Sequence, residues 1–316
     1  MADVQKLLGE YLDYLEIEKN RSPKTRENYE RYLKDFLRST NIKTPQQITE
    51  DVVRKYRIDL NRRLVSPKHS GEGGTMKKVT QNYYLIALRN FLKYLSRRDI
   101  KSLAPEKIEL PKIPERQIDI IEYRDLERLL AAPKETDIKT VRDKAILETL
   151  FSTGLRLAEL CSLNCDIDLE RGEFTIRGKG NKLRVVFLSE GARNTLKQYL
   201  KMRGDMEEAM FISFAKGKIS AGGGSSSGGK VTGRIQPRAV ERLVDFWARK
   251  AGIAKRLHPH QLRHLFATDL LINGADLRSV QSLLGHANIT TTQTYTHLTN
   301  KELKEIHSAF HGKRRK

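Results

Sequence analysis

Apolar residues recur at helical spacing in four successive windows of the first hundred residues, and this pattern constrains the fold more than any other feature. The windows run over 4–15, 29–37, 52–64 and 84–95. Spacings of three and four residues place apolar side chains on one face of a helix, and each such face needs a partner to cover it. The sequence therefore predicts four packed helices in the first part of the chain.

The second of these helices has a recognisable start at Ser22-Pro23. Serine can cap a helix with its side-chain oxygen, and proline is tolerated at the first helical position because its missing N–H would have had no partner there. We therefore expect the second helix to begin at Pro23.

A proline-containing stretch follows the four windows and indicates a domain boundary. It covers 104–115, holds Pro105, Pro111 and Pro114, and has no apolar periodicity. Proline makes a linker stiff and extended, so about ten residues span roughly 30 Å. The length of 316 residues also favours two domains, since about 150 residues is the usual size. We expect a first domain at 1–103, a linker at 104–115 and a second domain at 116–316.

The second half combines helices with one hairpin, which gives a mainly α fold with a small β-sheet. β-rich arms flank a Gly-Lys-Gly-Asn-Lys tip within 173–188, and glycine and asparagine suit a tight turn. A low-complexity Gly/Ser stretch at 221–230 indicates a flexible insertion or linker. Helices are expected at 140–152, 156–163, 190–202, 237–251, 259–273, 276–284 and, near the end, about 300–310.

The charge of the chain indicates its partner. The sequence holds 59 Lys+Arg against 39 Asp+Glu, for a formal net charge of +20. Such an excess favours a polyanion, with nucleic acid first and an anionic membrane surface second. No apolar run approaches the roughly 18 residues of a membrane span and no signal peptide is recognisable, so we expect a cytoplasmic protein. Cys161 and Cys165 are expected to be reduced packing residues, because their spacing fits neither a metal site nor a disulfide framework.

Four short motifs stand in order along the chain. They are TGLRLAEL at 153–160, GKGNK at 178–182, HPHQLRH at 258–264 and LLGHANITTTQTYTH at 283–297. Together they resemble the tyrosine recombinase, or phage integrase, family, and most of all its Xer-type members. The resemblance covers nearly the whole chain. It implies an N-terminal helical, SAM-like core-binding domain that binds DNA, and an α+β catalytic domain.

The resemblance also implies a set of catalytic residues and roles. Tyr295 is the expected nucleophile, and His260 its proton acceptor. The hairpin lysine, Lys179, would supply a proton to the leaving 5′-hydroxyl, with Lys182 as a rival for this role. The set carried over from the motifs is Arg156, Lys179, His260, Arg263, His286 and Tyr295, with Glu159 in support.

Phosphodiester chemistry needs these residue types. Negative charge gathers on the nonbridging oxygens during attack, and two arginines suit it because the guanidinium stays charged and binds phosphate oxygens through two N–H groups. A tyrosine with a pKa near 10 needs a base or a cationic surround in order to attack. Glu159 follows Arg156 by three residues, one helical turn, so its carboxylate can orient the guanidinium. We expect neither a cofactor nor a metal, because Gln261 stands where a zinc-binding HExxH helix has its glutamate.

Each residue alone has a structural interpretation. Arg156 could be a surface arginine, Lys179 a solvated loop charge, His286 a core histidine and Tyr295 a half-buried packing residue. Their joint occurrence favours catalysis. Two departures from the family pattern are the Gly/Ser stretch and Phe187, which stands where proline is usual.

The resemblance further implies partners and a reaction. These are a double-stranded DNA recombination site, a homotetramer or a heterotetramer with a related recombinase, and a DNA translocase as regulator. Strand exchange would pass through 3′-phosphotyrosine links and a Holliday junction, in chromosome dimer resolution. The alternatives are an integrase of a mobile element, a non-catalytic architectural DNA-binding protein and a basic membrane-surface protein.

Overall fold

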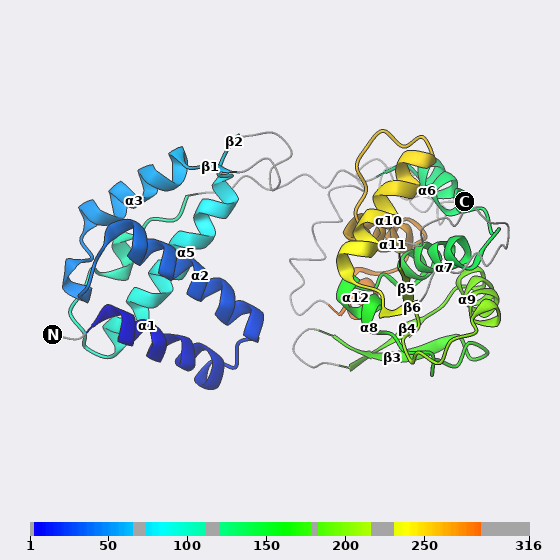
Figure 1. Cartoon of the computed structure of the whole chain (residues 1–316), viewed down its shortest axis with the longest axis horizontal. Helices are drawn as coiled ribbons and strands as arrows, with labels where there is room; N and C mark the ends of the chain where they lie inside the picture. Colours follow the sequence, from blue (N-terminus) through cyan, green and yellow to red (C-terminus); the bar gives the residue numbers. More distant parts are fainter. Residues whose placement is uncertain (1–2, 66–73, 112–120, 179–182, 216–230, 286–316) are drawn as a thin grey trace, which may run out of the picture. The chain divides into compact units, whose positions relative to one another are not determined.

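The computed structural model describes residues 3–65, 74–111, 121–178, 183–215 and 231–285. The chain divides into two compact units, Met1–Gln117 and Ile118–Lys316 (Figure 1). Each is described by itself. The Gly/Ser stretch and the helix expected near 300–310 lie outside the described residues.

The described residues of the first unit form four helices, as the sequence predicts. Short elements join them: a π turn at Tyr14–Glu18, 3-10 turns at Pro45–Gln47 and Pro105–Lys107, and a two-stranded ribbon of β1 (Leu64–Val65) and β2 (Gly74–Thr75). The helices are α1 (Val4–Asp13), α2 (Pro23–Thr40), α3 (Glu50–Arg62) and α5 (Lys78–Arg97).

Local signals set two of the helix ends in this unit. The Ser22 hydroxyl accepts a hydrogen bond from the Thr25 backbone N–H at 3.3 Å, so the predicted start of α2 is confirmed. Leu64, which the periodicity assigned to the third helix, lies beyond it and is 81% exposed. The reason is that Arg63 adopts an extended backbone conformation, which ends α3 before Leu64 and starts β1.

The core of the first unit collects the apolar faces of all four helices. Leu8, Phe36, Leu60 and Leu88 are buried there. Ile108 joins them from the proline-containing stretch, so residues 104–111 pack on this unit. The few apolar residues of this stretch, Ile108, Leu110 and Ile113, are separated by charges and prolines and do not recur at helical spacing, which is why the sequence pattern does not show this contact.

The second unit contains seven helices among its described residues. The six helices expected there are confirmed to within about two residues at each end, whereas α6 was not predicted. Their bounds are α6 (Tyr123–Ala131), α7 (Ile138–Thr153), α8 (Leu157–Ser162), α9 (Glu190–Met202), α10 (Pro237–Lys250), α11 (Pro259–Ile272) and α12 (Leu277–Leu284).

The strands described in the second unit form two antiparallel pairs. The predicted hairpin is β3 (Glu173–Arg177) with β4 (Leu183–Phe187), in a register that pairs Glu173 with Phe187. Pairing therefore continues through Phe187, whose side chain is exposed. The other pair, β5 (Ile212–Phe214) and β6 (Val231–Arg234), was not predicted and flanks the Gly/Ser-containing segment.

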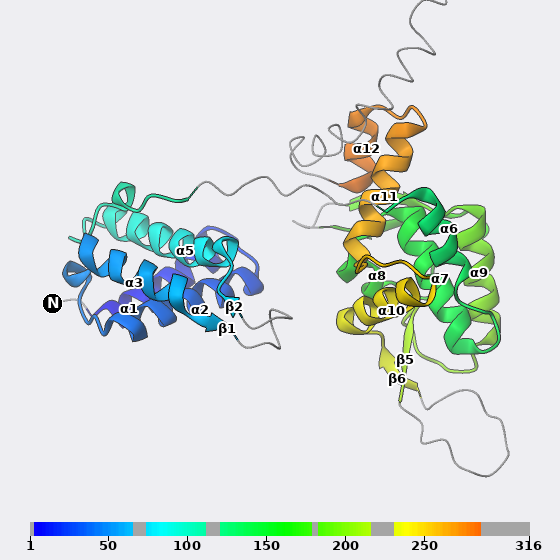
Figure 2. The ribbon, with the colours of Figure 1, turned by 90° about the horizontal axis from the view of Figure 1, so that it is seen from above.

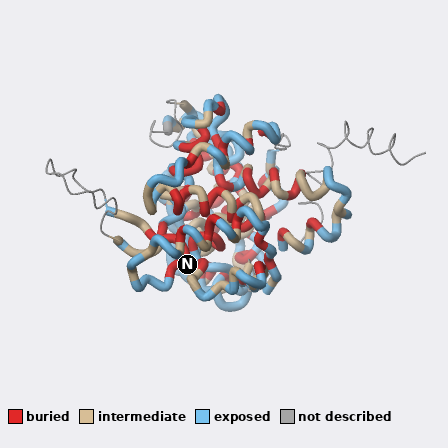
Figure 3. The backbone as a smooth tube through the Cα atoms, turned by 90° about the vertical axis from the view of Figure 1, so that its right-hand side faces the viewer, coloured by how far each residue is buried: buried red, intermediate tan, exposed pale blue. Residues whose placement is uncertain are grey.

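Helix α7 is the centre of the second unit. It contacts α6, α9, α10 and α11, so it is buried on several sides, and Figure 3 shows the buried residues gathered inside. A polar cluster is buried with it: Asp143 accepts hydrogen bonds from the Arg142 guanidinium and, at 2.9 Å, from the Trp247 ring N–H. Each charge in this cluster is paired, as burial requires.

Helix α12 packs apart from the main core. Val280 and Leu284 form a small cluster with Ala267 of α11. Figure 2 shows α12 at one end of the second unit and the β5–β6 hairpin at the other. Among the described residues, no helix combines the length and the apolar character that a membrane crossing requires.

Candidate active site

Arg156 lies at the N-terminus of α8, where the Glu159 carboxylate binds both its backbone N–H and its guanidinium. Gly154 ends α7 with a φ of +58°, and the chain turns before α8 begins. The Arg156 backbone N–H donates to Glu159 Oε2 at 2.7 Å, and its Nη1 donates to Oε1 at 2.9 Å. The predicted support by Glu159 is thus a capping contact and an ion pair together. The Arg156 side chain remains 30% exposed.

Arg184 of β4 binds the same carboxylate through two hydrogen bonds. Its Nη1 donates to Glu159 Oε1 at 3.0 Å and its Nη2 to Oε2 at 2.7 Å. Both side chains are only 8% exposed. Burial by itself would raise the pKa of Glu159, but hydrogen bonds from Arg184 and Arg156 outweigh it and lower that pKa below the ordinary value. Glu159 is therefore an ionised carboxylate at neutral pH.

Arg263 of α11 lies deeper than Arg156. Its side chain is 1% exposed, and its guanidinium donates to two backbone carbonyl oxygens, those of Gly154 and, at 2.7 Å, of Leu284. These carbonyls belong to the end of α7 and the end of α12. Arg263 therefore connects three helices around one buried charge.

Gly285 completes the arrangement at the end of α12. Its φ of +63° is a conformation that favours glycine, and its carbonyl oxygen accepts a hydrogen bond from Arg156 Nη2 at 3.3 Å. A Cβ at this position would stand 3.0 Å from Cδ of Arg184. Thus β4, the end of α12 and the residue that begins α8 meet at this point.

His260 lies in the first turn of α11 with an exposed side chain. Its ring meets that of His264 edge to face, with 4.4 Å between the ring centroids. Partial removal of water from around the ring, followed by the charges of Arg263 and Arg156, lowers the pKa of His260 below 6.5. At neutral pH the imidazole is neutral and can accept a proton. Among the described residues, no three His, Cys, Asp or Glu side chains gather as a metal site would require.

The four described residues of the predicted site are in one neighbourhood. Arg156 and Arg263 both influence His260, and both reach the end of α12 through Gly285 and Leu284. The other predicted residues lie outside the described residues: Lys179, Lys182, His286 and Tyr295.

Comparisons with known proteins cover both units of the chain. The model described as "Phage integrase family" matches residues 120–302, and that described as "Phage integrase, N-terminal SAM-like domain" matches residues 8–99. The chain belongs to the phage integrase family.

Two curated relatives of this phage integrase family chain carry the same name. It is 32% identical to "Tyrosine recombinase XerC" of Thermodesulfovibrio yellowstonii and 34% identical to "Tyrosine recombinase XerC" of Shigella flexneri, in both cases over 98% of each chain. The predicted enzyme class, tyrosine site-specific recombinase, is confirmed.

A solved structure agrees on the family fold. "XerH site-specific recombinase bound to palindromic difH substrate" matches with a TM-score of 0.66 and 22% identity, covering 95% of this chain and 83% of that one. The predicted architecture, a SAM-like helical domain plus a catalytic integrase domain, is confirmed.

Sequence reasoning missed Arg184, although a signal was present. Strand residues alternate between two faces, and in β4 the apolar Leu183, Val185 and Phe187 face outward whereas Val186 is buried. Arg184 shares the inward face with Val186. An arginine on the buried face of a strand needs an ionised partner, which in this family member is Glu159.

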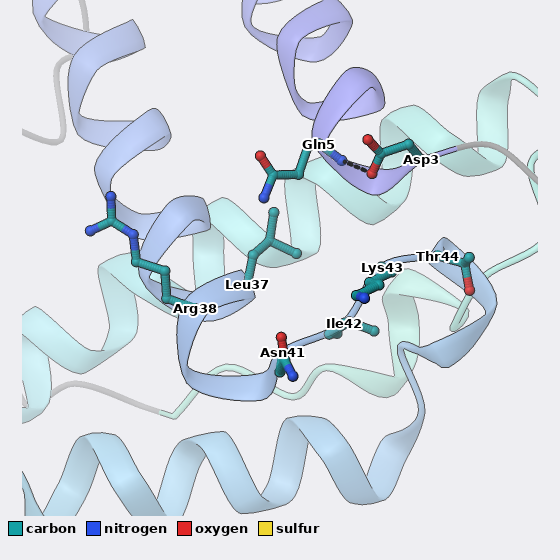
Figure 4. Close-up of a pocket in the computed structure, with 8 residues that line it drawn as sticks. All are labelled: Asp3, Gln5, Leu37, Arg38, Asn41, Ile42, Lys43 and Thr44. Atoms are coloured by element: carbon teal, nitrogen blue, oxygen red, sulfur yellow. Dashed lines mark hydrogen bonds between the residues drawn. The ribbon is translucent and has the colours of Figure 1, made fainter.

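The first unit has a hollow whose described side chains cap or end helices. Figure 4 shows it between the start of α1 and the end of α2. Asp3 accepts a hydrogen bond from the Gln5 backbone N–H at 3.0 Å, and Asn41 ends α2 with a φ of +52°. These side chains serve helix ends. The lining residues are Asp3, Gln5, Leu37, Arg38, Asn41, Ile42, Lys43 and Thr44.

Proposed function

We propose that this protein is a Xer-type recombinase that breaks and rejoins DNA through a covalent 3′-phosphotyrosine link at Tyr295. The observation that carries the proposal is the fixed Arg156 guanidinium, which Glu159 and the Gly285 carbonyl orient while the side chain stays partly exposed. These two contacts leave other N–H donors of the guanidinium able to bind the nonbridging oxygens of a phosphate.

Arg263 has a different part in this proposal. It is buried, both its charge and that of Arg156 act on His260, and a charge in a poorly hydrated interior acts strongly over short distances. We assign it electrostatic stabilisation of the phosphate as negative charge develops, together with positioning of α12. His286, directly after Gly285, would donate a hydrogen bond to the same phosphate.

The chemical step follows from these roles. The Tyr295 oxygen attacks phosphorus and gives its proton to neutral His260, the P–O5′ bond breaks, and Lys179 protonates the departing 5′-oxygen. The 5′-hydroxyl of a partner strand then attacks the phosphotyrosine, and Tyr295 leaves and regains a proton. One phosphoester replaces another at each step, so no energy source is needed.

The proposed partners follow from the same reaction. Exchange between two DNA sites requires four cleavages, so four subunits are the natural assembly, either of this chain alone or with a related recombinase. A structural neighbour, the Tn1549 transposon integrase, is described as in complex with a circular intermediate DNA, which supports DNA as the partner. Chromosome dimer resolution in the cytoplasm, through a Holliday junction and under a DNA translocase, is the proposed role.

The test is covalent trapping. A candidate recombination site with a nick beside the cleavage position loses a short fragment after attack, so the covalent adduct accumulates and survives detergent. Wild-type protein should form it, and Tyr295→Phe should bind the same DNA without forming it. Tyr123→Phe is the matched control, because Tyr123 is an exposed tyrosine at the start of α6. An adduct with Tyr295→Phe, or none with wild type on any site that it binds, would refute the proposal.

A further inference from the structure

We propose that Arg184 is a positioning residue for Arg156, acting through Glu159. The inference rests on the proposed function and concerns how the guanidinium that meets the phosphate is kept in place and kept positively charged. Arg184 itself is 8% exposed and faces Glu159, so it acts at one remove from DNA.

The contacts of Arg184 are concentrated on one partner. Its two terminal nitrogens donate to the two oxygens of Glu159, at 3.0 and 2.7 Å, in the parallel geometry that arginine and carboxylate favour. Its Nε has no hydrogen-bond partner in the described part of the chain. The guanidinium is therefore fixed by Glu159, and Glu159 is in turn fixed against rotation.

The paired contact between Arg184 and Glu159 limits the hydrogen bonds that the Arg156 guanidinium makes to the same carboxylate. Each Glu159 oxygen already accepts a bond from Arg184, so Arg156 reaches it with Nη1 alone and directs Nη2 to the Gly285 carbonyl. Without Arg184, Glu159 Oε1 would accept only from Arg156 Nη1 and Oε2 only from the Arg156 backbone N–H, so both oxygens would have room for a paired contact with the Arg156 guanidinium. That contact would turn the guanidinium away from the orientation proposed for phosphate binding.

The net charge of the three side chains is a second reason to assign Arg184 a supporting role. Arg156 and Glu159 alone form a neutral pair, which has little attraction for a phosphate. With Arg184 the three side chains carry a net charge of +1, and the exposed member is Arg156. A buried second arginine thus allows a carboxylate to orient Arg156 without cancelling its charge.

The position of Arg184 in the fold links several parts of the site. It is the second residue of β4, which follows the segment that carries Lys179, and its stem packs where Gly285 lacks a Cβ. Gly285 in turn immediately precedes His286. The orientation of Arg156 therefore depends on how β4 and the end of α12 sit against α8.

The experiment measures cleavage separately from DNA binding. Single-turnover cleavage of the nicked substrate is followed at saturating protein, and affinity is measured by gel shift, for Arg184→Met and Arg184→Lys in the full-length chain. Arg184→Met should cleave up to about 10²-fold more slowly, the scale expected when a reacting group is displaced by about 1 Å, with affinity retained. The cleavage rate of Arg184→Lys should lie between those of wild type and Arg184→Met, because lysine keeps the charge and loses the paired geometry.

A double-mutant cycle separates positioning from a general loss of structure. In an Arg156→Ala background, Arg184→Met should have little further effect on the cleavage rate. Arg203→Met is the matched control, because Arg203 is another buried arginine of this unit, paired with Asp205 instead of Glu159. It should lower the melting temperature and leave the rate per folded molecule unchanged.

The possible failures are distinguishable. Wild-type protein that forms no adduct refutes the proposed function, and the inference falls with it. Wild-type cleavage with an undiminished rate in Arg184→Met, or an equal loss with and without Arg156, overturns the positioning role alone. Should Arg184→Met not fold, a wild-type cleavage rate in Arg184→Lys would overturn the positioning role in the same way.

Discussion

Arg263 donates a hydrogen bond of 2.7 Å to the carbonyl oxygen of Leu284, the last residue of α12, while the same guanidinium also bonds the Gly154 carbonyl. Arg263→Ala would leave both carbonyls without this donor and a cavity in its place. We expect a loss of about 3 kcal/mol in the free energy of unfolding, seen as a lower melting temperature. The cleavage rate of the folded fraction should fall on the order of 10².

Arg249→Ala is the control for this prediction. Arg249 makes an exposed pair with Asp245 on α10, and such pairs contribute at most about 1 kcal/mol. A melting temperature in Arg263→Ala as high as in Arg249→Ala would contradict the role of Arg263 as a connection between helices.

The pH dependence of cleavage should report His260. Because its pKa is lowered by loss of water, Arg263 and Arg156, the proton-accepting form is already present at neutral pH. The rate of cleavage should rise with pH through a midpoint below 6.5 and then level off. Arg156→Ala removes one of these causes, so the midpoint in that variant should move upward. A midpoint above 6.5 in wild type would contradict this assignment.

The same shift predicts how stability depends on pH. A histidine with a lowered pKa in the folded state binds protons more readily when unfolded, so its contribution is present above about 6.5 and is lost as pH falls through the folded pKa. Replacing His260 by Gln should flatten the melting temperature across this window. A melting profile that is as steep in His260→Gln as in wild type would show that other groups set it.

Charge stabilisation by arginine leads to a prediction about metal removal. Because Arg156 and Arg263 supply the positive charge proposed for the phosphate, the nicked substrate should be cleaved at an unchanged rate in excess EDTA. Arg156→Ala should lower that rate on the order of 10² in the same buffer. Loss of wild-type cleavage in EDTA, with recovery on adding Mg²⁺, would require a different mechanism.

The C-terminal segment should control assembly. The sequence predicts a helix near 300–310 with Leu303, Ile306 and Phe310 on one face, and so short a helix is marginal alone. We expect it to dock on a neighbouring subunit, since head-to-tail contacts close into rings. A chain ending at Asn300 should bind single sites yet lose cooperative binding and strand exchange, as native gels and recombination assays would show. Unchanged tetramers would place the helix on its own subunit.

Helical periodicity and motif order were enough to predict much of this protein. The four described helices of the first unit, six helices of the second and the β3–β4 hairpin follow from local spacing. The reason is that the buried residues of a helix or strand recur along the sequence at the period of that element. The family and the pairing of Glu159 with Arg156 also follow, since three residues span one helical turn. Helix α6 was missed although Leu126, Leu129 and Leu130 stand at helical spacing and its partner α7 begins soon after it, at Ile138. The β5–β6 pair and the packing of Ile108 do not follow, because their partners are distant in the chain.

The sequence by itself determined the family and supplied the proposed set of catalytic residues, since the motifs are contiguous and the proposed reaction dictates the residue types. Only the tertiary structure decided how the described ones are held. Arg184 reaches Glu159 across 25 residues, and Arg263 reaches Leu284 across 21 and Gly154 across 109. A buried charge must find its partner in space. No local pattern identifies that partner, because packing of α8, α11, α12 and β4 brings the two together.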